Sequence, residues 1–233
     1  GRRERLQAYR TSRDNGAAPV RRDSGGAIFI DFPAANKHKN GDGNMNATER
    51  IVESYFRIER KCFTITDIKI PKGNNRQIDI LAYSLKSGEC YHIEVGVTHC
   101  ENWCADIEKL DAKFGYKFFG FPKNKRPSNP NTDYAKEKTY RQNIEKAYEN
   151  YGFKPTDVIR VLCSWYFKED KKKLEELIKK EANKYKLEKK NFEFLSFRDD
   201  VIPKIQEYIG TAHYDDEILR TFSLLCQYEK QKK

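Results

Sequence analysis

No apolar run in this chain approaches the roughly 20 residues that are needed to cross a bilayer, so a membrane-embedded protein is not expected. The 233 residues include one methionine, two tryptophans and six cysteines, but no Cys-x-x-Cys pair. Several of the cysteines lie in apolar, strand-like runs, where a free thiol packs as a small hydrophobe. Because the start of the chain also shows no secretory signal pattern, we expect a cytoplasmic protein with reduced thiols and no membrane partner.

Positive charge is in excess, since 45 Lys and Arg against 35 Asp and Glu give a formal net charge of +10. Such an excess is typical of proteins that bind a polyanion, and we expect nucleic acid, in particular DNA. Two segments that are expected to be loops carry candidate phosphate contacts, namely Lys72, Arg76, Lys123, Lys125 and Arg126. Ordinary solvated loops on a protein with a lysine-rich surface are the alternative.

The chain divides by composition near residue 45. Residues 1–44 are rich in Arg, Gly, Asn, Asp and Ala and show little periodicity, which predicts a poorly ordered basic extension. Residues 45–233 predict a single domain with a helix, a meander of three strands, a helix, and then strands alternating with helices. This order indicates an α/β fold with a mixed central sheet flanked by helices and with further helices at the C-terminal end.

Several elements of this domain can be placed more closely. Thr48 is expected to cap the first helix, and a second helix is expected over residues 101–114. A short strand over residues 118–121 and a loop over residues 122–132, which holds three prolines, should follow.

A predicted hairpin is the most informative part of the chain. Residues 76–82 and 91–98 alternate at period two and contain many β-branched residues, as paired strands do. If residues 85–88 form a four-residue loop with glycine at its end, Ser84 faces Glu89. The same register then brings two acids of the hairpin opposite each other.

These two acids are Asp79 and Glu94. Directly opposed residues of antiparallel strands have Cβ atoms about 5 Å apart, and two carboxylates this close repel each other unless a cation lies between them. Hard oxygen ligands in a pair suit Mg²⁺, for which Mn²⁺ can substitute. Two ordinary surface carboxylates are the alternative, but the apolar residues on either side of each acid predict burial, where an acid needs a partner.

Zinc is a weaker alternative. His99, Cys100 and Cys104 offer three potential ligands, but no fourth ligand follows in local spacing. Burial of the two cysteines against the sheet explains their spacing as well, so zinc is not expected.

The element order, with Asp79 on the second strand and Glu94 on the third, resembles the PD-(D/E)XK nuclease superfamily, which has a restriction-endonuclease-like fold with an αβββαβ core. The resemblance covers about residues 46–209. It implies that the two acids bind Mg²⁺ and that a glutamate of the first helix joins them. Glu49 is the better match for that glutamate, and Glu53 lies one turn further on.

The sequence departs from the family motif at Gly96, where relatives carry a lysine that positions or polarises the attacking water. Three replacements remain open. His92 projects from the same strand face and can act as acid or base near neutral pH. Lys109 and Lys113, one turn apart on the next helix, could reach the space that Gly96 leaves, or nothing replaces the lysine.

Three functions therefore remain open. The leading hypothesis is a Mg²⁺-dependent DNA endonuclease, which would be slow if nothing replaces the lysine. The second is a nuclease-fold DNA-binding module without activity, and the third is a scaffold or assembly protein that does not bind nucleic acid. The sequence leaves the oligomeric state open, with a homodimer among the options.

Overall fold

The computed structural model consists of two compact units, Gly1–Asp42 and Gly43–Lys233. The structure describes residues 45–71, 76–98, 106–120 and 130–232, and also residues 20–22 and 28–30. For residues 20–22, 28–30 and 130–138 it describes the backbone alone. In the first unit, β1 (Val20–Arg22) and β2 (Ile28–Ile30) form an antiparallel pair. The predicted poor order of residues 1–44 otherwise falls outside the described residues.

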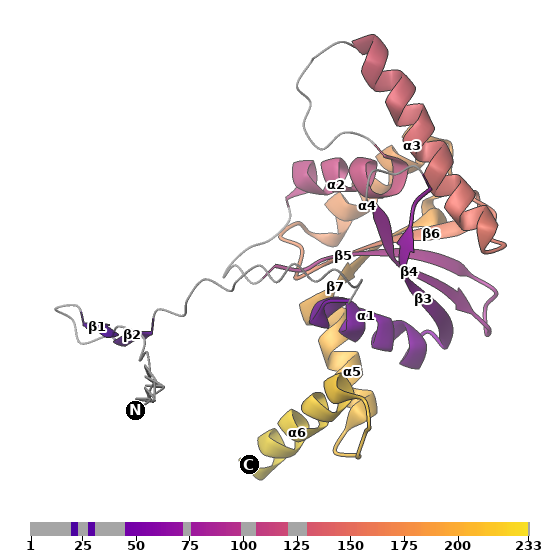
Figure 1. The fold of residues 1–233 in the computed structure, drawn as a ribbon. Coiled ribbons are helices and arrows are strands. Elements are labelled where there is room, and N and C mark those ends of the chain that lie inside the picture. The colour runs from indigo at the N-terminus through magenta and orange to yellow at the C-terminus, as the bar shows by residue number, and fades with distance from the viewer. Residues whose placement is uncertain are drawn as a thin grey trace, which may run out of the picture. The chain divides into compact units, whose positions relative to one another are not determined.

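A five-stranded mixed sheet lies at the centre of the second unit, and its strands lie side by side in the order of the sequence (Figure 1). Three strands form an antiparallel meander, namely β3 (Cys62–Lys69), β4 (Gln77–Ser84) and β5 (Cys90–Gly96). β6 (Val158–Ser164) and β7 (Phe192–Ser196) then continue the sheet parallel to β5. The parallel step from β5 to β6 requires a long crossover, which helices provide.

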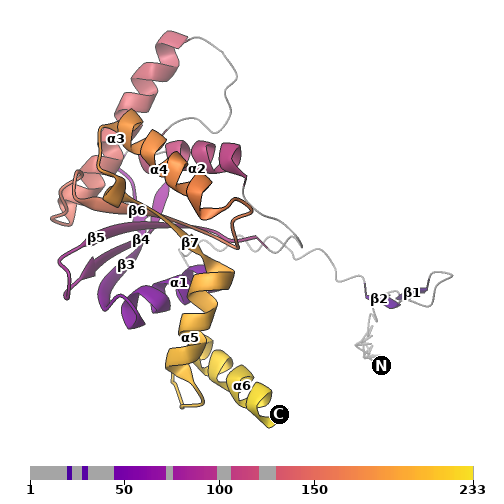
Figure 2. The ribbon, with the colours of Figure 1, turned by 180° about the vertical axis from the view of Figure 1, so that it is seen from behind.

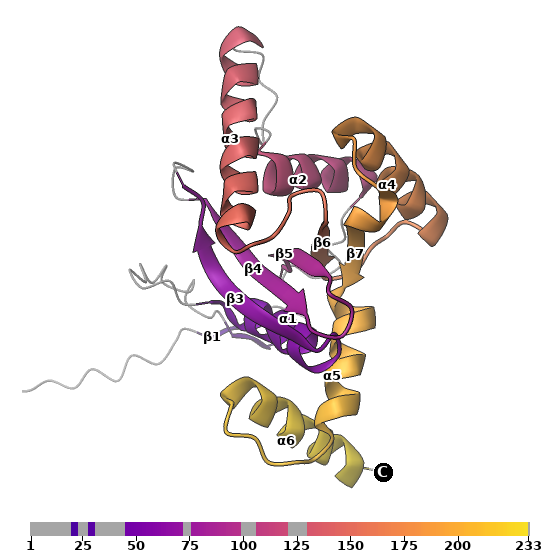
Figure 3. The same cartoon turned by 90° about the vertical axis from the view of Figure 1, so that its right-hand side faces the viewer.

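Helices cover both faces of this sheet, which confirms the predicted α/β architecture (Figures 1 and 2). One face packs against α1 (Ala47–Ile58) and α5 (Ile202–Ile209). The other face packs against α2 (Ile107–Phe119), α3 (Pro130–Asn150) and α4 (Lys171–Tyr185). Two apolar layers therefore share one sheet, and α6 (Glu217–Gln231) packs beside α5 at the end of the chain (Figure 3).

The alternation of the strands decides which residues meet which layer. Ile80 of β4 and Ile93 of β5 belong to the layer under α1. Leu81, the next residue of β4, belongs to the layer under α3, and Leu162 of β6 to the layer under α2. The polar residues of the hairpin that alternate with Ile80 and Ile93 are consequently directed to the side of α2 and α3.

The first helix is capped by Asn46 and not by Thr48. The Asn46 side chain accepts a hydrogen bond from the backbone N–H of Glu49 at 3.0 Å, and the Glu49 carboxylate accepts one from the backbone N–H of Asn46 at 3.1 Å. This reciprocal capping box satisfies two backbone donors at once, which a cap at Thr48 would leave unpaired.

The boundaries around α2 also differ from expectation. Residues 118 and 119 end α2 instead of beginning a strand, and Gly120 closes the helix with a φ of 79°, a left-handed conformation that suits glycine. α3 begins at Pro130, inside the expected loop, because proline is well accepted in the first turn of a helix. α2 itself begins at Ile107, after the cap Asp106, and not at residue 101.

The predicted absence of a membrane-spanning helix and the predicted free thiols can both be compared with residues of the described ranges. Within them, no helix is both long enough and apolar enough to cross a membrane. The cysteines that these ranges contain are free thiols, as predicted, namely Cys62, Cys90, Cys163 and Cys226.

Candidate active site

Asp79 and Glu94 come together near the open end of the hairpin, near the start of β4 and toward the end of β5. The loop spans the predicted residues 85–88, and β4 and β5 pair with Ile80 opposite Ile93. One residue further in the same register, Asp79 lies opposite Glu94, as the sequence predicted. Both acids are buried, with 6% and 1% of their surface exposed.

A lysine that the sequence did not single out lies beside this pair. The Nζ of Lys117, on α2, lies 2.5 Å from Oε2 of Glu94 and 3.9 Å from Oδ2 of Asp79. Burial acts to lower the pKa of Lys117, but the charges of Glu94 and Asp79 outweigh it and raise the pKa. The ammonium group is therefore charged at neutral pH.

The two acids retain protons more strongly than exposed carboxyl groups do. Burial and then the neighbouring charge of Glu94 raise the pKa of Asp79 to about 7. Two contacts act in the opposite direction, namely the charge of Lys117 and a hydrogen bond of 2.8 Å that Asp79 accepts from the backbone N–H of Val95. Burial also raises the pKa of Glu94, again against Lys117. One lysine thus compensates for only part of the burial and repulsion of two carboxylates.

His92 lies behind Glu94 and is fully buried. Its Nε2 is 2.8 Å from Oε1 of Glu94, and its Nδ1 is 2.6 Å from the hydroxyl of Tyr148 on α3. Burial, with the charge of Arg160, lowers the pKa of His92 well below its usual value, so the ring is neutral. An ionised Glu94 can only accept, so Nε2 carries the proton and Nδ1 accepts from Tyr148. This arrangement orients Glu94.

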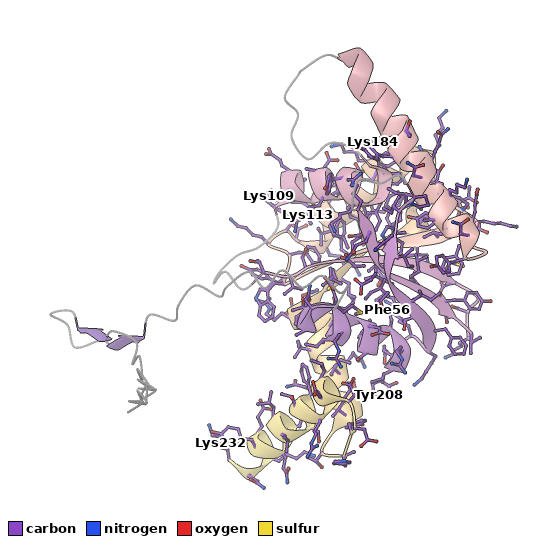
Figure 4. The ribbon with its side chains drawn as sticks, viewed as in Figure 1. Phe56, Lys109, Lys113, Lys184, Tyr208 and Lys232 are labelled. Carbon is purple, nitrogen blue, oxygen red and sulfur yellow. The ribbon has the colours of Figure 1, made fainter. Side chains whose placement is uncertain are left out.

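Lysines of α2 lie on the side of the sheet where Gly96 leaves space, and Figure 4 labels two of them, Lys109 and Lys113, on this helix. A Cβ atom at Gly96 would lie 3.0 Å from Nζ of Lys113, so this lysine reaches into the space that the glycine leaves. The Nζ of Lys109 is 2.7 Å from a carboxylate oxygen of Asp106, the N-cap of the same helix. Lys117 lies four residues after Lys113, as Lys113 lies four residues after Lys109. This regular spacing is the signal in the sequence that could have identified Lys117 as a residue of the site.

The two glutamates of α1 have different surroundings. Glu49 belongs to the capping box, and its pKa is raised first by burial and then by the charge of Asp79, which indicates that its carboxylate senses the pair. Glu53 instead accepts a hydrogen bond from the hydroxyl of Thr64 on β3 at 2.7 Å. The charge of Asp79 is thus one of the influences on Glu49.

Only one of the candidate phosphate contacts lies in the described part of the chain. The guanidinium carbon of Arg76 lies 4.0 Å from the centroid of the Tyr116 ring, and one of its nitrogens donates to the Tyr116 carbonyl at 2.6 Å. The remaining candidates lie outside the described residues, namely Lys72, Lys123, Lys125 and Arg126. The same holds for the zinc candidates His99, Cys100 and Cys104.

The chemistry of the donor set fits a hard divalent cation. Asp79 and Glu94 supply carboxylate oxygens from adjacent strands, and Oε2 of Glu94 is buried with the Lys117 ammonium 2.5 Å away. Mg²⁺ is commonly held by one or two carboxylates, with waters and substrate phosphates as its other ligands. A complete protein cage is not present, since the described residues contain no cluster of three or more His, Cys, Asp or Glu side chains that could hold a metal.

Comparisons of this chain with protein-family models, with curated proteins and with solved structures found no match. The function must therefore be argued from the site. Its distinctive content is a pair of buried carboxylates, a lysine from a neighbouring helix in contact with them, and a neutral histidine that orients one of them.

Proposed function

We propose that this protein is a Mg²⁺-dependent DNA endonuclease with a restriction-endonuclease-like core. The observation that carries the proposal is the convergence of Asp79 and Glu94, with the Lys117 ammonium 2.5 Å from one and 3.9 Å from the other. Acids from adjacent strands and a lysine beside them are the groups that metal-assisted hydrolysis of a phosphodiester requires.

The topology supports the same conclusion. The order of α1, the antiparallel meander β3 to β5, the helices α2 and α3, and the parallel strand β6 corresponds to an αβββαβ core. The two acids lie on the second and third strands of that order, where the resemblance to PD-(D/E)XK nucleases requires them. The net charge of +10 adds a general attraction for a polyanionic substrate.

Each residue of the site has a role in this proposal. Asp79 and Glu94 would hold the metal, with Glu49 as a further ligand, directly or through water. When bound, Mg²⁺ polarises the scissile phosphate and lowers the pKa of a coordinated water. Lys117 is protonated, so it donates hydrogen bonds, orients the attacking water and stabilises negative charge that develops on the phosphate. The lysine that relatives carry on the strand is thus supplied here by α2.

The contact between Lys117 and Glu94 also favours a second candidate function. An ammonium group 2.5 Å from a buried carboxylate oxygen already neutralises part of the site. If the ion pair persists when Mg²⁺ is added, the domain binds DNA without cutting it.

The proposal is tested by cleavage of labelled single-stranded and duplex DNA with Mg²⁺ or Mn²⁺. We expect cleavage by the wild type and loss of it in Asp79→Asn and Glu94→Gln, whereas the control Lys146→Met, an exposed lysine of α3, should cut normally. A wild type that binds DNA but never cuts it with either metal would establish the second candidate. Absence of both binding and cleavage would favour a scaffold.

A further inference from the structure

A cavity of about 350 Å³ opens between α2 and the C-terminal end of β5, directly beside Glu94. Its wall is largely apolar and includes Val95, Ala112 and Leu162, and Tyr116 adds an aromatic ring. Cavities of this size hold small organic groups. Such a cavity is larger than metal binding and water activation at Glu94 require.

Lysines border this cavity in a regular row. Lys109, Lys113 and Lys117 all line it, and they are spaced by four residues on α2. With a rise of 1.5 Å per residue, successive members are about 6 Å apart along the helix and lie on one face of it. A row of positive charges with this repeat suits the successive phosphates of one nucleic-acid strand that lies along the helix.

We propose that the cavity receives the base of an unpaired nucleotide while the three lysines bind the phosphates of that strand, so that the substrate of this site is single-stranded DNA. A base inside a duplex cannot enter a cavity in a protein wall unless it leaves its stack, which costs free energy. A base in a single strand has no partner, so no free energy is needed to unpair it. This inference rests on the proposed function, since the cavity is continuous with Glu94.

Tyr116 supplies the aromatic ring on which such a base would stack. The guanidinium group of Arg76 covers its ring, with the guanidinium carbon 4.0 Å from the ring centroid, and fixes the ring in place. Tyr116 also lines the cavity, so a base that enters the cavity meets this ring. Stacking on aromatic side chains together with a basic track is the usual way in which proteins hold single strands without reading their sequence.

The binding test uses fluorescence anisotropy of one labelled oligonucleotide, alone and annealed to its complement, in EDTA so that no cleavage occurs. We expect the single strand to bind about tenfold or more tightly than the duplex. Tyr116→Leu should remove most of this preference, and Ala112→Phe, which fills the cavity from an exposed position, should do the same. The matched control Tyr151→Leu changes an exposed tyrosine outside the cavity and should bind like the wild type.

The outcomes separate this inference from the proposed function. Equal or tighter binding of the duplex, or wild-type binding by both Tyr116→Leu and Ala112→Phe, would overturn the inference even if the protein cuts DNA. Preferential binding of the single strand that depends on Tyr116, with no cleavage in Mg²⁺ or Mn²⁺, would support the inference and reject the nuclease. Circular dichroism of each variant shows that the fold is kept.

Discussion

The Nε2 atom of His92 lies 2.8 Å from Oε1 of Glu94, and both side chains are buried. The hydroxyl of Tyr148, from a helix 56 residues further along the chain, holds the other ring nitrogen at 2.6 Å. His92 thus links a helix of the crossover to the carboxylate of the proposed metal site. Because both ring nitrogens are engaged away from solvent, the contact orients Glu94 and leaves the chemistry to groups that reach the cavity.

His92 should make the stability of the protein sensitive to acid. Burial keeps the pKa of the folded ring well below 6.5, whereas the unfolded ring titrates near 6.5. Below that pH the unfolded state binds more protons, so the free energy of unfolding should fall as the pH is lowered from about 6.5.

His92→Gln should remove this contribution and lower stability at pH 8 by about 1–3 kcal/mol, because a buried partner is lost. Urea denaturation at several pH values measures both effects. His213→Gln, at an exposed histidine, is the matched control and should be as stable as the wild type at pH 8. A pH profile that is the same in His92→Gln and wild type would contradict the prediction.

Glu181 on α4 should have the opposite effect on stability. It is buried beside Asp111, and Nζ of Lys184 is 3.7 Å from its Oε1 atom. Burial, and then its contact with Asp111, raise the pKa of Glu181 to about 7. The folded state therefore holds a proton that the unfolded state releases near pH 4.5, and stability should decrease as the pH rises from 4.5 to 7.

Glu181→Gln should remove this decrease and raise the melting temperature at pH 8 by a few degrees. Glu175→Gln, on the exposed side of the same helix, should have little effect. Scanning calorimetry at pH 5 and pH 8 provides the comparison, and a destabilised Glu181→Gln at pH 8 would show that the ionised carboxylate stabilises the fold.

Asp79→Asn should abolish cleavage and leave the metal-free protein as stable as the wild type or slightly more stable. The change removes repulsion between two buried carboxylates, while the new side chain can still accept from the Val95 N–H. Thermal melts in EDTA and in Mg²⁺ give a readout that does not depend on activity. The melting temperature of the wild type should rise with Mg²⁺ and that of Asp79→Asn should not. A marked loss of stability in EDTA would instead identify Asp79 as a structural residue.

Variants at Lys117 and Gly96 should show which lysine of α2 takes part in cleavage and which lysines only line the cavity. We expect Lys117→Met to lower the cleavage rate about 10²–10⁴-fold, in the range seen when a positioned proton-transfer or oxyanion group is removed. Gly96→Lys should also lower activity, because the Cβ position at Gly96 is already 3.0 Å from Nζ of Lys113. The measurement is the single-turnover cleavage rate of each variant, with Lys146→Met as the control. Faster cleavage by Gly96→Lys would mean that the native site lacks a working lysine.

Much of the hairpin could be predicted from the sequence, because its information is local. Period-two alternation and the length of the loop set the pairing of β4 with β5, and the pairing brings Asp79 opposite Glu94. The mostly apolar run of β6 is likewise a local pattern that is typical of a strand in the interior of a sheet. Errors arose at helix ends, where Asn46 and Gly120 provide caps that compete with other plausible residues.

The sequence by itself determined which strand face the two acids share and that Lys109 and Lys113 lie one turn apart on the next helix. It did not determine that this helix continues to Phe119 and so carries Lys117. Only the tertiary structure decided which lysine reaches the acids. Helical periodicity defines a face but not the position of the helix along its axis, and that position depends on how Leu110 and Phe114 pack on the sheet. The role of His92 was decided in the same way, because its partner Tyr148 is distant in the sequence and meets it only when α3 packs against the sheet.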